Sequence, residues 1–125
     1  ISPSDFGFHN ILESKDKLYF LDFEYAGWDD PAKTLCDYGC QPEYPISEKH
    51  KDLFISNFTS LIKIPQLKER ALLLEPLYKL KWCCILLNEF KKELFDRRLY
   101  SMGEEGVLLN KQLKKAQDYF KLTQV

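Results

Sequence analysis

The sequence predicts an α+β domain, in which a short β-hairpin comes first and a mainly helical part follows. Turn residues and short apolar and aromatic runs come before Pro31, and apolar residues at helical spacing come after it. The length of 125 residues fits one domain, and 45% hydrophobic residues are enough to bury a core. We therefore divide the chain into a hairpin part, residues 1–28, and a helical part, residues 29–125.

The hairpin is predicted from residues 17–24, K-L-Y-F-L-D-F-E, which are rich in β-forming side chains. Residues 14–17 form the expected turn before them, and residues 11–13 the expected partner strand. Asn10 then precedes the first strand, and Asp22 lies near the end of the second. Antiparallel pairing is expected to bring these two residues close together in space.

Two helix starts are visible after the hairpin. Asp29-Asp30-Pro31 predicts the first, because an Asp side chain caps free N–H groups and proline fits the first helical turn. This helix is expected to end near Gly39. Ser47 is expected to cap the second helix, whose apolar positions at helical spacing are Leu53, Phe54, Phe58, Leu61 and Ile62.

The rest of the chain also has helical patterns. Residues 66–75 and 77–94 predict helices broken or kinked at Pro76, which cannot donate a backbone hydrogen bond. Residues 82–87 are apolar all round, so we expect the second of these helices to be central. After a loop at residues 101–106, a last helix carries Leu109, Leu113, Ala116 and Phe120 on one stripe.

Charge, hydropathy and cysteine usage exclude several classes of protein. Eighteen basic and 19 acidic residues leave no basic excess to bind nucleic acid. The longest apolar-rich run without a charge, at residues 53–62, is much shorter than the roughly 20 residues of a transmembrane helix. The four cysteines, Cys36, Cys40, Cys83 and Cys84, are not spaced for a zinc site or an unstrained disulfide framework. We therefore predict a cytoplasmic protein with reduced thiols.

The first 22 residues carry the richest chemistry. Asp5 is followed five positions later by Asn10, which is the D-x-x-x-x-N spacing of a kinase catalytic loop. Chance alone gives roughly 0.3 such pairs in a chain of this composition, so the pair needs its context. That context is the hairpin and Asp22 at the end of an apolar strand. In phosphoryl transfer an Asp accepts the proton of the attacking hydroxyl, while an Asn and a second Asp hold Mg²⁺ on the ATP phosphates.

Two stretches, I-S-P-S-D-F-G-F-H-N-I-L and L-Y-F-L-D-F-E-Y-A-G-W-D-D-P, resemble the aminoglycoside phosphotransferase family of kinase-fold enzymes. The usual family pattern is H-G-D-L-H-P-G-N-I-L, then I-D-F-E-x-A-x-x-G-D-P-x-x-D-L-A. The resemblance implies a protein-kinase-like C-terminal lobe that transfers the γ-phosphoryl group of ATP to a small-molecule hydroxyl. It implies Asp5 as catalytic base, Asn10 and Asp22 as Mg²⁺ ligands, and Asp30-Pro31 at the start of a helix that supports the site.

The sequence departs from the family pattern at three places. Pro3 replaces the family's His two positions before the catalytic Asp, and Gly7-Phe8-His9 replaces H-P-G. The Asp that usually follows D-P and buttresses the catalytic loop is Thr34 here. Asp37, one turn further on the same helix face, is the candidate substitute for it. We interpret the chain as a divergent member, because Asp5, Asn10 and Asp22 are all present.

The resemblance also sets expectations for what accompanies this chain. The sequence has no G-x-G-x-x-G and no strand lysine before the catalytic loop, so we expect the nucleotide-clamping N-terminal lobe to be missing from it and to act in cis. This chain alone is expected to be inactive. Antibiotic, choline, sugar and lipopolysaccharide-core hydroxyls all remain open as substrates. Glu24 and Trp28 are candidates for the substrate pocket, with loop packing as the equal alternative.

Two rival interpretations remain. The first is a pseudokinase-like module, in which Pro3 and Thr34 mark a decayed catalytic loop that still binds nucleotide or a partner without turnover. The second is a helical interaction domain with no active site, which is expected if Asp5, Asn10 and Asp22 do not converge.

Overall fold

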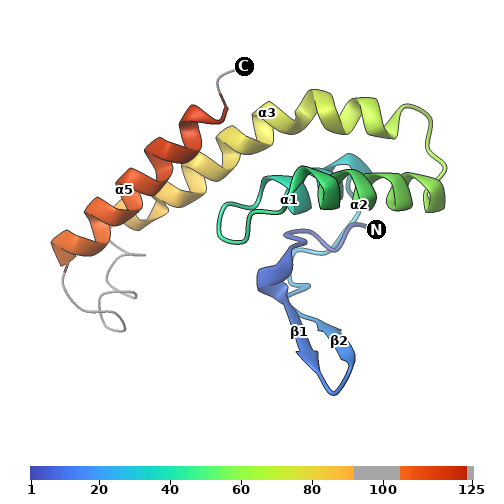
Figure 1. Ribbon diagram of the computed structural model, residues 1–125, viewed down its shortest axis with the longest axis horizontal. Coiled ribbons are helices and arrows are strands. Elements are labelled where there is room, and N and C mark those ends of the chain that lie inside the picture. Colours follow the sequence, from blue (N-terminus) through green and yellow to red (C-terminus); the bar gives the residue numbers. More distant parts are fainter. Residues whose placement is uncertain (92–104, 124–125) are drawn as a thin grey trace. The chain divides into compact units, whose positions relative to one another are not determined.

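The computed structural model describes residues 1–91 and 105–123, and it confirms the α+β class (Figure 1). The predicted helical residues 92–94 and loop residues 101–104 lie outside the described part. The chain forms two compact units, Ile1–Tyr78 and Lys79–Val125, which we describe separately. The elements are η1 (Phe8–Asn10), β1 (Ile11–Ser14), β2 (Lys17–Phe20), α1 (Pro31–Cys40), α2 (Glu48–Leu61), α3 (Leu67–Leu86), η2 (Leu87–Phe90) and α5 (Glu105–Lys121).

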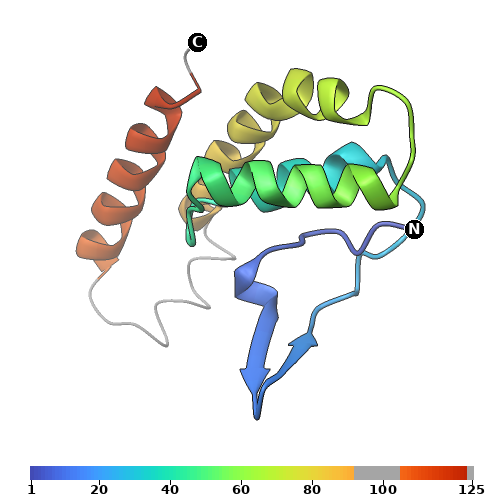
Figure 2. The same cartoon turned by 45° about the vertical axis from the view of Figure 1, so that its right-hand side comes forward.

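The predicted hairpin is present in the first unit. Strands β1 and β2 pair antiparallel, from Ile11 opposite Phe20 to Ser14 opposite Lys17. The turn residues Lys15 and Asp16 have φ of 49° and 59°, the left-handed values that a two-residue hairpin turn requires. The hairpin extends away from α1 and α2 (Figures 1 and 2), and all of its strand residues except Ile11 are exposed. Because an isolated two-stranded hairpin is marginally stable, the contacts at its open end must hold it in place.

Both predicted helix starts are confirmed. The Asp30 side chain accepts a hydrogen bond from the Ala32 backbone N–H at the start of α1, with Pro31 as the first helical residue. The Ser47 side chain accepts from the His50 backbone N–H at the start of α2. The first of these helices orients the residues that contact the Asp5 loop.

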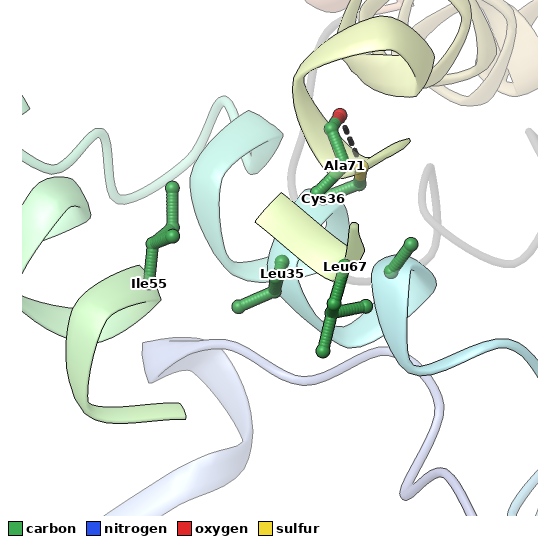
Figure 3. Packing of buried hydrophobic residues seen from close by; sticks show 6 residues of the cluster. Leu35, Cys36, Ile55, Leu67 and Ala71 are labelled. Carbon is green, nitrogen blue, oxygen red and sulfur yellow. Dashed lines mark hydrogen bonds between the residues drawn. The ribbon is translucent and has the colours of Figure 1, made fainter. Parts of the chain in front are cut away.

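The core of the first unit joins three helices (Figure 3). Its buried members are Ala32, Leu35 and Cys36 from α1, Ile55 from α2, and Leu67 and Ala71 from α3. The Cys36 thiol points toward α3 and donates to the Ala71 carbonyl at 3.4 Å, as Figure 3 shows. Burial raises the pKa of Cys36 to about 12, so this thiol is a packing group and not a nucleophile.

The buried face of α2 differs in part from the prediction. Phe54 and Phe58 pack on the core as expected, together with Ile62 just after the helix and the buried Ile55. Leu53 and Leu61 are 57% and 81% exposed, so their assignment to the buried face was wrong. The face of α2 that contacts the core is therefore narrower than the full set of its apolar residues.

Helix α3 continues through Pro76, so the predicted break is absent. Proline removes one backbone hydrogen bond, but Ala71 and Leu74 before it and Tyr78 after it pack on the same core and hold the helix across that position. No described helix is long and apolar enough to cross a lipid bilayer.

The second unit is built from the end of α3, η2 and α5, and α5 lies against η2. Trp82, Cys83 and Leu86 are buried, and so is Ala116 of the predicted α5 stripe. Cys84, Ile85 and Leu87 are exposed, so the prediction of a helix buried all round was wrong for this segment. Leu113 and Phe120 of the α5 stripe are 38% and 44% exposed.

A partly buried ion pair joins α2 to α3. Lys51 Nζ lies 2.7 Å from both carboxylate oxygens of Glu75, and the two side chains are 12% and 15% exposed. Burial alone would lower the pKa of Lys51, but the hydrogen bond and charge of Glu75 outweigh it and raise this pKa above 10.5. While Glu75 is ionised, the stability that the raised pKa of Lys51 contributes is present below the ordinary lysine pKa and is lost as the pH rises through the raised pKa.

We expect Lys51→Met to lower the free energy of unfolding by about 3 kcal/mol, because Glu75 loses its cation in a poorly solvated position. Urea denaturation of the chain measures this. Lys49→Met, at an exposed position on the same helix, is the control and should change stability by less than about 0.5 kcal/mol. Adding Glu75→Gln to Lys51→Met should recover most of the loss, and a double variant as unstable as the single one would show that charge burial is not the cause.

Candidate active site

Two backbone connections tie the Asp5 loop to the segment that follows β2. Ser2 and Gly27 form an antiparallel bridge, with N···O distances of 2.8 and 3.1 Å. At the other end, the Leu21 N–H donates to the Asn10 carbonyl at 2.9 Å and extends the hairpin pairing by one step. The two stretches between these connections, residues 3–9 and 22–26, therefore lie in one backbone frame that contains Asp5 and Asp22.

Asp5 lies on a strained part of this frame. Ser4 and Asp5 have φ of 54° and 43°, in the left-handed region that side-chain-bearing residues seldom adopt. The Asn10 side chain bridges the loop, because its Nδ2 donates to the Asp5 carbonyl oxygen at 3.1 Å. This bond uses the amide nitrogen of Asn10 and leaves Oδ1 as the atom of the amide that can accept. The Asp5 side chain is 43% exposed.

Phe6 anchors the loop directly after Asp5. Its ring contacts Phe20 of β2 at 6.1 Å, Tyr38 of α1 at 6.0 Å and Phe54 of α2 at 5.7 Å between centroids. Such aromatic pairs contribute packing and a preferred ring geometry. The hairpin, the loop and two helices thus meet at one side chain, beside the candidate base.

The His9 side chain contacts the carboxylate of the candidate base, Asp5. Its Nε2 is 3.3 Å from Asp5 Oδ2, and its Nδ1 is 3.4 Å from Nε2 of the buried Gln41. Gln41 Oε1 accepts from two backbone N–H groups, those of Glu43 and Tyr44, which fixes the amide with its nitrogen toward His9. His9 Nδ1 is then an acceptor, and the Nε2–H faces the Asp5 carboxylate.

The two candidate metal ligands lie at the open end of the hairpin, where the Asn10 carbonyl accepts from Leu21 and Asp22 is the next residue after Leu21. Asp22 is exposed and has φ of 60°, a left-handed value that Asp tolerates better than most residues. An amide oxygen and a carboxylate are hard donors, which fit Mg²⁺ when water and phosphate oxygens complete its shell. Within residues 1–91 and 105–123, no group of three His, Cys, Asp or Glu side chains gathers into an all-protein metal site.

Asp30 caps α1 and also joins it to α3. Its carboxylate receives Arg70 Nη2 at 2.8 Å, and this hydrogen bond lowers the pKa of Asp30 below its ordinary value. The Asp30 side chain contacts Ala32 and Arg70, which fixes the start of α1 and joins it to α3. The role of Asp30 in the site remains a prediction.

The face of α1 toward the loop carries Thr34 and Asp37. The Thr34 hydroxyl lies 3.2 Å from the Ser2 hydroxyl, so the residue in the place of the family's Asp touches the start of the loop. Asp37 is fully buried, and its Oδ2 is 3.0 Å from Lys33 Nζ. Lys33 in turn donates to Ser4 Oγ. Asp37 is thereby connected to the residue before Asp5 through a lysine that the sequence did not single out.

The two candidate pocket residues are placed differently. Trp28, 92% exposed, borders a groove of about 480 Å³ in the first unit, together with Phe6, Asp29, Thr34, Phe54 and Phe58. Glu24 does not line this groove. It hydrogen-bonds the neighbouring Tyr25, whose pKa is raised by that bond and by the carboxylate charge. Of the two, Trp28 lies at this groove and Glu24 does not.

Sequence reasoning missed His9, Gln41 and Lys33 as parts of this site. His9 and Asp5 are four residues apart, but the chain between them is not helical, because Asp5 has a left-handed φ, Gly7 is extended and η1 begins only at Phe8, so the helical spacing rule does not predict their contact. Lys33 and Gln41 are 29 and 32 positions from their loop partners, so no local pattern reveals them.

No family model, no curated protein and no solved structure matches this chain.

Proposed function

We propose that this chain is the C-terminal lobe of a small-molecule phosphotransferase of the aminoglycoside phosphotransferase type. The reaction is the transfer of the γ-phosphoryl group of ATP to a hydroxyl, with Mg²⁺ and with a nucleotide-binding lobe in cis. The observation that carries the proposal is the pair of backbone connections, Ser2–Gly27 and Asn10–Leu21, which hold Asp5, Asn10 and Asp22 in one frame. A helical interaction domain would not need that frame.

Each residue has a distinct task in this proposal. Asp5 accepts the proton of the attacking hydroxyl, and its partly exposed carboxylate leaves room for a substrate beside it. The amide oxygen of Asn10 and the carboxylate of Asp22 would hold Mg²⁺, which neutralises charge on the phosphates when bound. His9 orients the Asp5 carboxylate through its Nε2 side. Because phosphoryl transfer depends mainly on position and charge, a rigid loop is the protein's main contribution.

A second candidate, a module that binds nucleotide without transfer, is favoured by one observation. The His9 ring is 3.3 Å from Asp5 Oδ2, at one of the two oxygens that would receive the hydroxyl proton. Pro3 also stands where the family has a His. In this alternative the loop holds metal and nucleotide while Asp5 is engaged within the protein.

The cysteines support the compartment that we propose. All four are free thiols, and Cys36, Cys40 and Cys83 are buried. Reduced thiols and ATP are both typical of the cytoplasm, where we place the protein.

The proposal is tested with the protein that contains this chain together with its nucleotide-binding lobe. Candidate hydroxyl compounds, namely an aminoglycoside, choline, a hexose and a lipopolysaccharide-core sugar, are incubated with ATP and Mg²⁺. We expect ADP to form in equal amount with a phosphate monoester, seen by ³¹P NMR, and only with Mg²⁺ present. Magnesium-dependent ATP binding without any monoester would favour the binding module, and the absence of both would reject the proposal.

A further inference from the structure

Lys33 is the centre of a polar cluster between α1 and the Asp5 loop. Its Nζ lies 2.5 Å from Ser4 Oγ, 3.0 Å from Asp37 Oδ2 and 3.6 Å from Asp29 Oδ2. An ammonium group has three N–H donors and no acceptor, so Lys33 donates to Ser4 and Asp37 at the same time, with Asp29 close enough for an ion pair. Its side chain is 16% exposed, and Asp37 is 0% exposed. The cluster is therefore a largely buried, charge-assisted contact and not a surface ion pair.

The contact with Ser4 reaches the strained part of the catalytic loop. Ser4 and Asp5 both have left-handed φ, a conformation that persists only where surrounding contacts determine it. The Ser4 side chain is held by Lys33, and the Ser4 N–H donates to Ser2 Oγ at 3.2 Å. Because Asp5 is the next residue, the backbone position of Ser4 restricts where the Asp5 side chain can point.

We infer that Lys33 is a positioning residue, which links the buried Asp37 to Ser4 and so fixes the direction of the Asp5 carboxylate; its catalytic meaning rests on the proposed function. With Thr34 in the usual place of the buttressing Asp, α1 holds the loop at two points. Thr34 contacts Ser2, and Lys33 contacts Ser4. Asp37 lies one turn beyond Thr34, and the lysine stem spans the added distance to the loop.

The first test measures the loop itself and needs no activity. Backbone hydrogen exchange is compared for the chain and its Lys33→Met, Lys33→Arg and Lys49→Met variants. We expect Lys33→Met to speed exchange of the Ser4 amide at least tenfold, with Lys33→Arg close to wild type because it keeps the charge and the donors. Lys49→Met, an exposed lysine of α2, should leave it unchanged. Unchanged Ser4 exchange in Lys33→Met would overturn the inference.

A structural loss must be separated from a loss of loop position, since Lys33→Met also removes the cation from Asp37. Lys33→Met/Asp37→Asn removes both charges, so it should regain stability against urea while the Ser4 amide still exchanges fast. If the double variant restored the slow Ser4 exchange, charge burial alone would explain the single variant and the inference would be wrong.

The second test uses the assay of the complete protein. Lys33→Met should lower kcat by about 10- to 100-fold with KM for ATP within twofold of wild type, because a misdirected base affects the chemical step. Lys33→Arg should recover kcat to within about fivefold. Adding Ser4→Ala to Lys33→Met should have no further effect, since both act through one contact. If the two substitutions lowered kcat independently, so that their separate factors multiplied in the double variant, the inference would be overturned. A wild-type protein without turnover would instead reject the proposed function, and the hydrogen exchange of Ser4 would then decide the role of Lys33.

Discussion

Asp5→Asn is expected to lower kcat of the complete protein by about 10² to 10⁴, with nucleotide affinity nearly unchanged. The substitution keeps the size of the side chain and removes the proton acceptor. Asn also tolerates the left-handed backbone of Asp5, φ 43°, so the loop conformation should survive. The measurement is steady-state phosphate transfer with ATP varied at saturating Mg²⁺, together with a thermal unfolding curve.

Asp52→Asn is the matched control for Asp5→Asn. Asp52 is an exposed residue of α2, so the same chemical change should leave kcat within about twofold. If Asp5→Asn left turnover at the wild-type level, the catalytic role of Asp5 would be wrong. The proposed loop would then be at most a binding element.

Asp22→Asn is expected to fail in a different way. It removes a charged oxygen ligand for a hard cation, so KM for the ATP–Mg²⁺ complex should rise at least about tenfold while kcat also falls. Raising the Mg²⁺ concentration should restore part of the activity, because weaker binding is offset by mass action. Titrations of Mg²⁺ at fixed ATP measure both effects.

Asp16→Asn provides a close control in the same hairpin. Asp16 and Asp22 have φ of 59° and 60°, and both are exposed, so the backbone cost of the substitution is matched. Asp16 lies in the turn, at the end of the hairpin away from Asn10. An Mg²⁺ dependence that is equal in the two variants would contradict a metal-binding role for Asp22.

The elements that the sequence predicted correctly are those with local signals. Residues 11–20 carried both the β-forming pattern and a turn of the right length, and they form the hairpin. Asp30 and Ser47 carried cap chemistry, and both cap helices. Placing Asn10 beside the end of the second strand followed from antiparallel pairing alone, whereas the metal-binding role of Asn10 and Asp22 stays a prediction.

The missed features depend on contacts between distant residues. The residues next to Lys33 in the sequence do not distinguish it from a surface lysine. It reaches Ser4, 29 positions away, because α1 packs against the loop. Pro76 signals a helix break, yet packing of both flanks on one core outweighs the lost hydrogen bond. Leu61 fits a helical stripe in sequence but lies 81% exposed, because the stripe that meets the core is narrower than the apolar pattern.

The backbone connections at Ser2–Gly27 and Asn10–Leu21 make the geometry of the site independent of the length of the hairpin. Both lie at the open end of β1 and β2, where Phe20 also packs on Phe6, so the strand residues nearer the turn lie outside the frame. Adding or removing two residues from each strand keeps the alternation of faces, the type of pair that the turn closes and the pairing at the open end. A change in hairpin length would therefore alter the surface that the hairpin presents to other molecules and leave the backbone frame around Asp5, Asn10 and Asp22 unchanged.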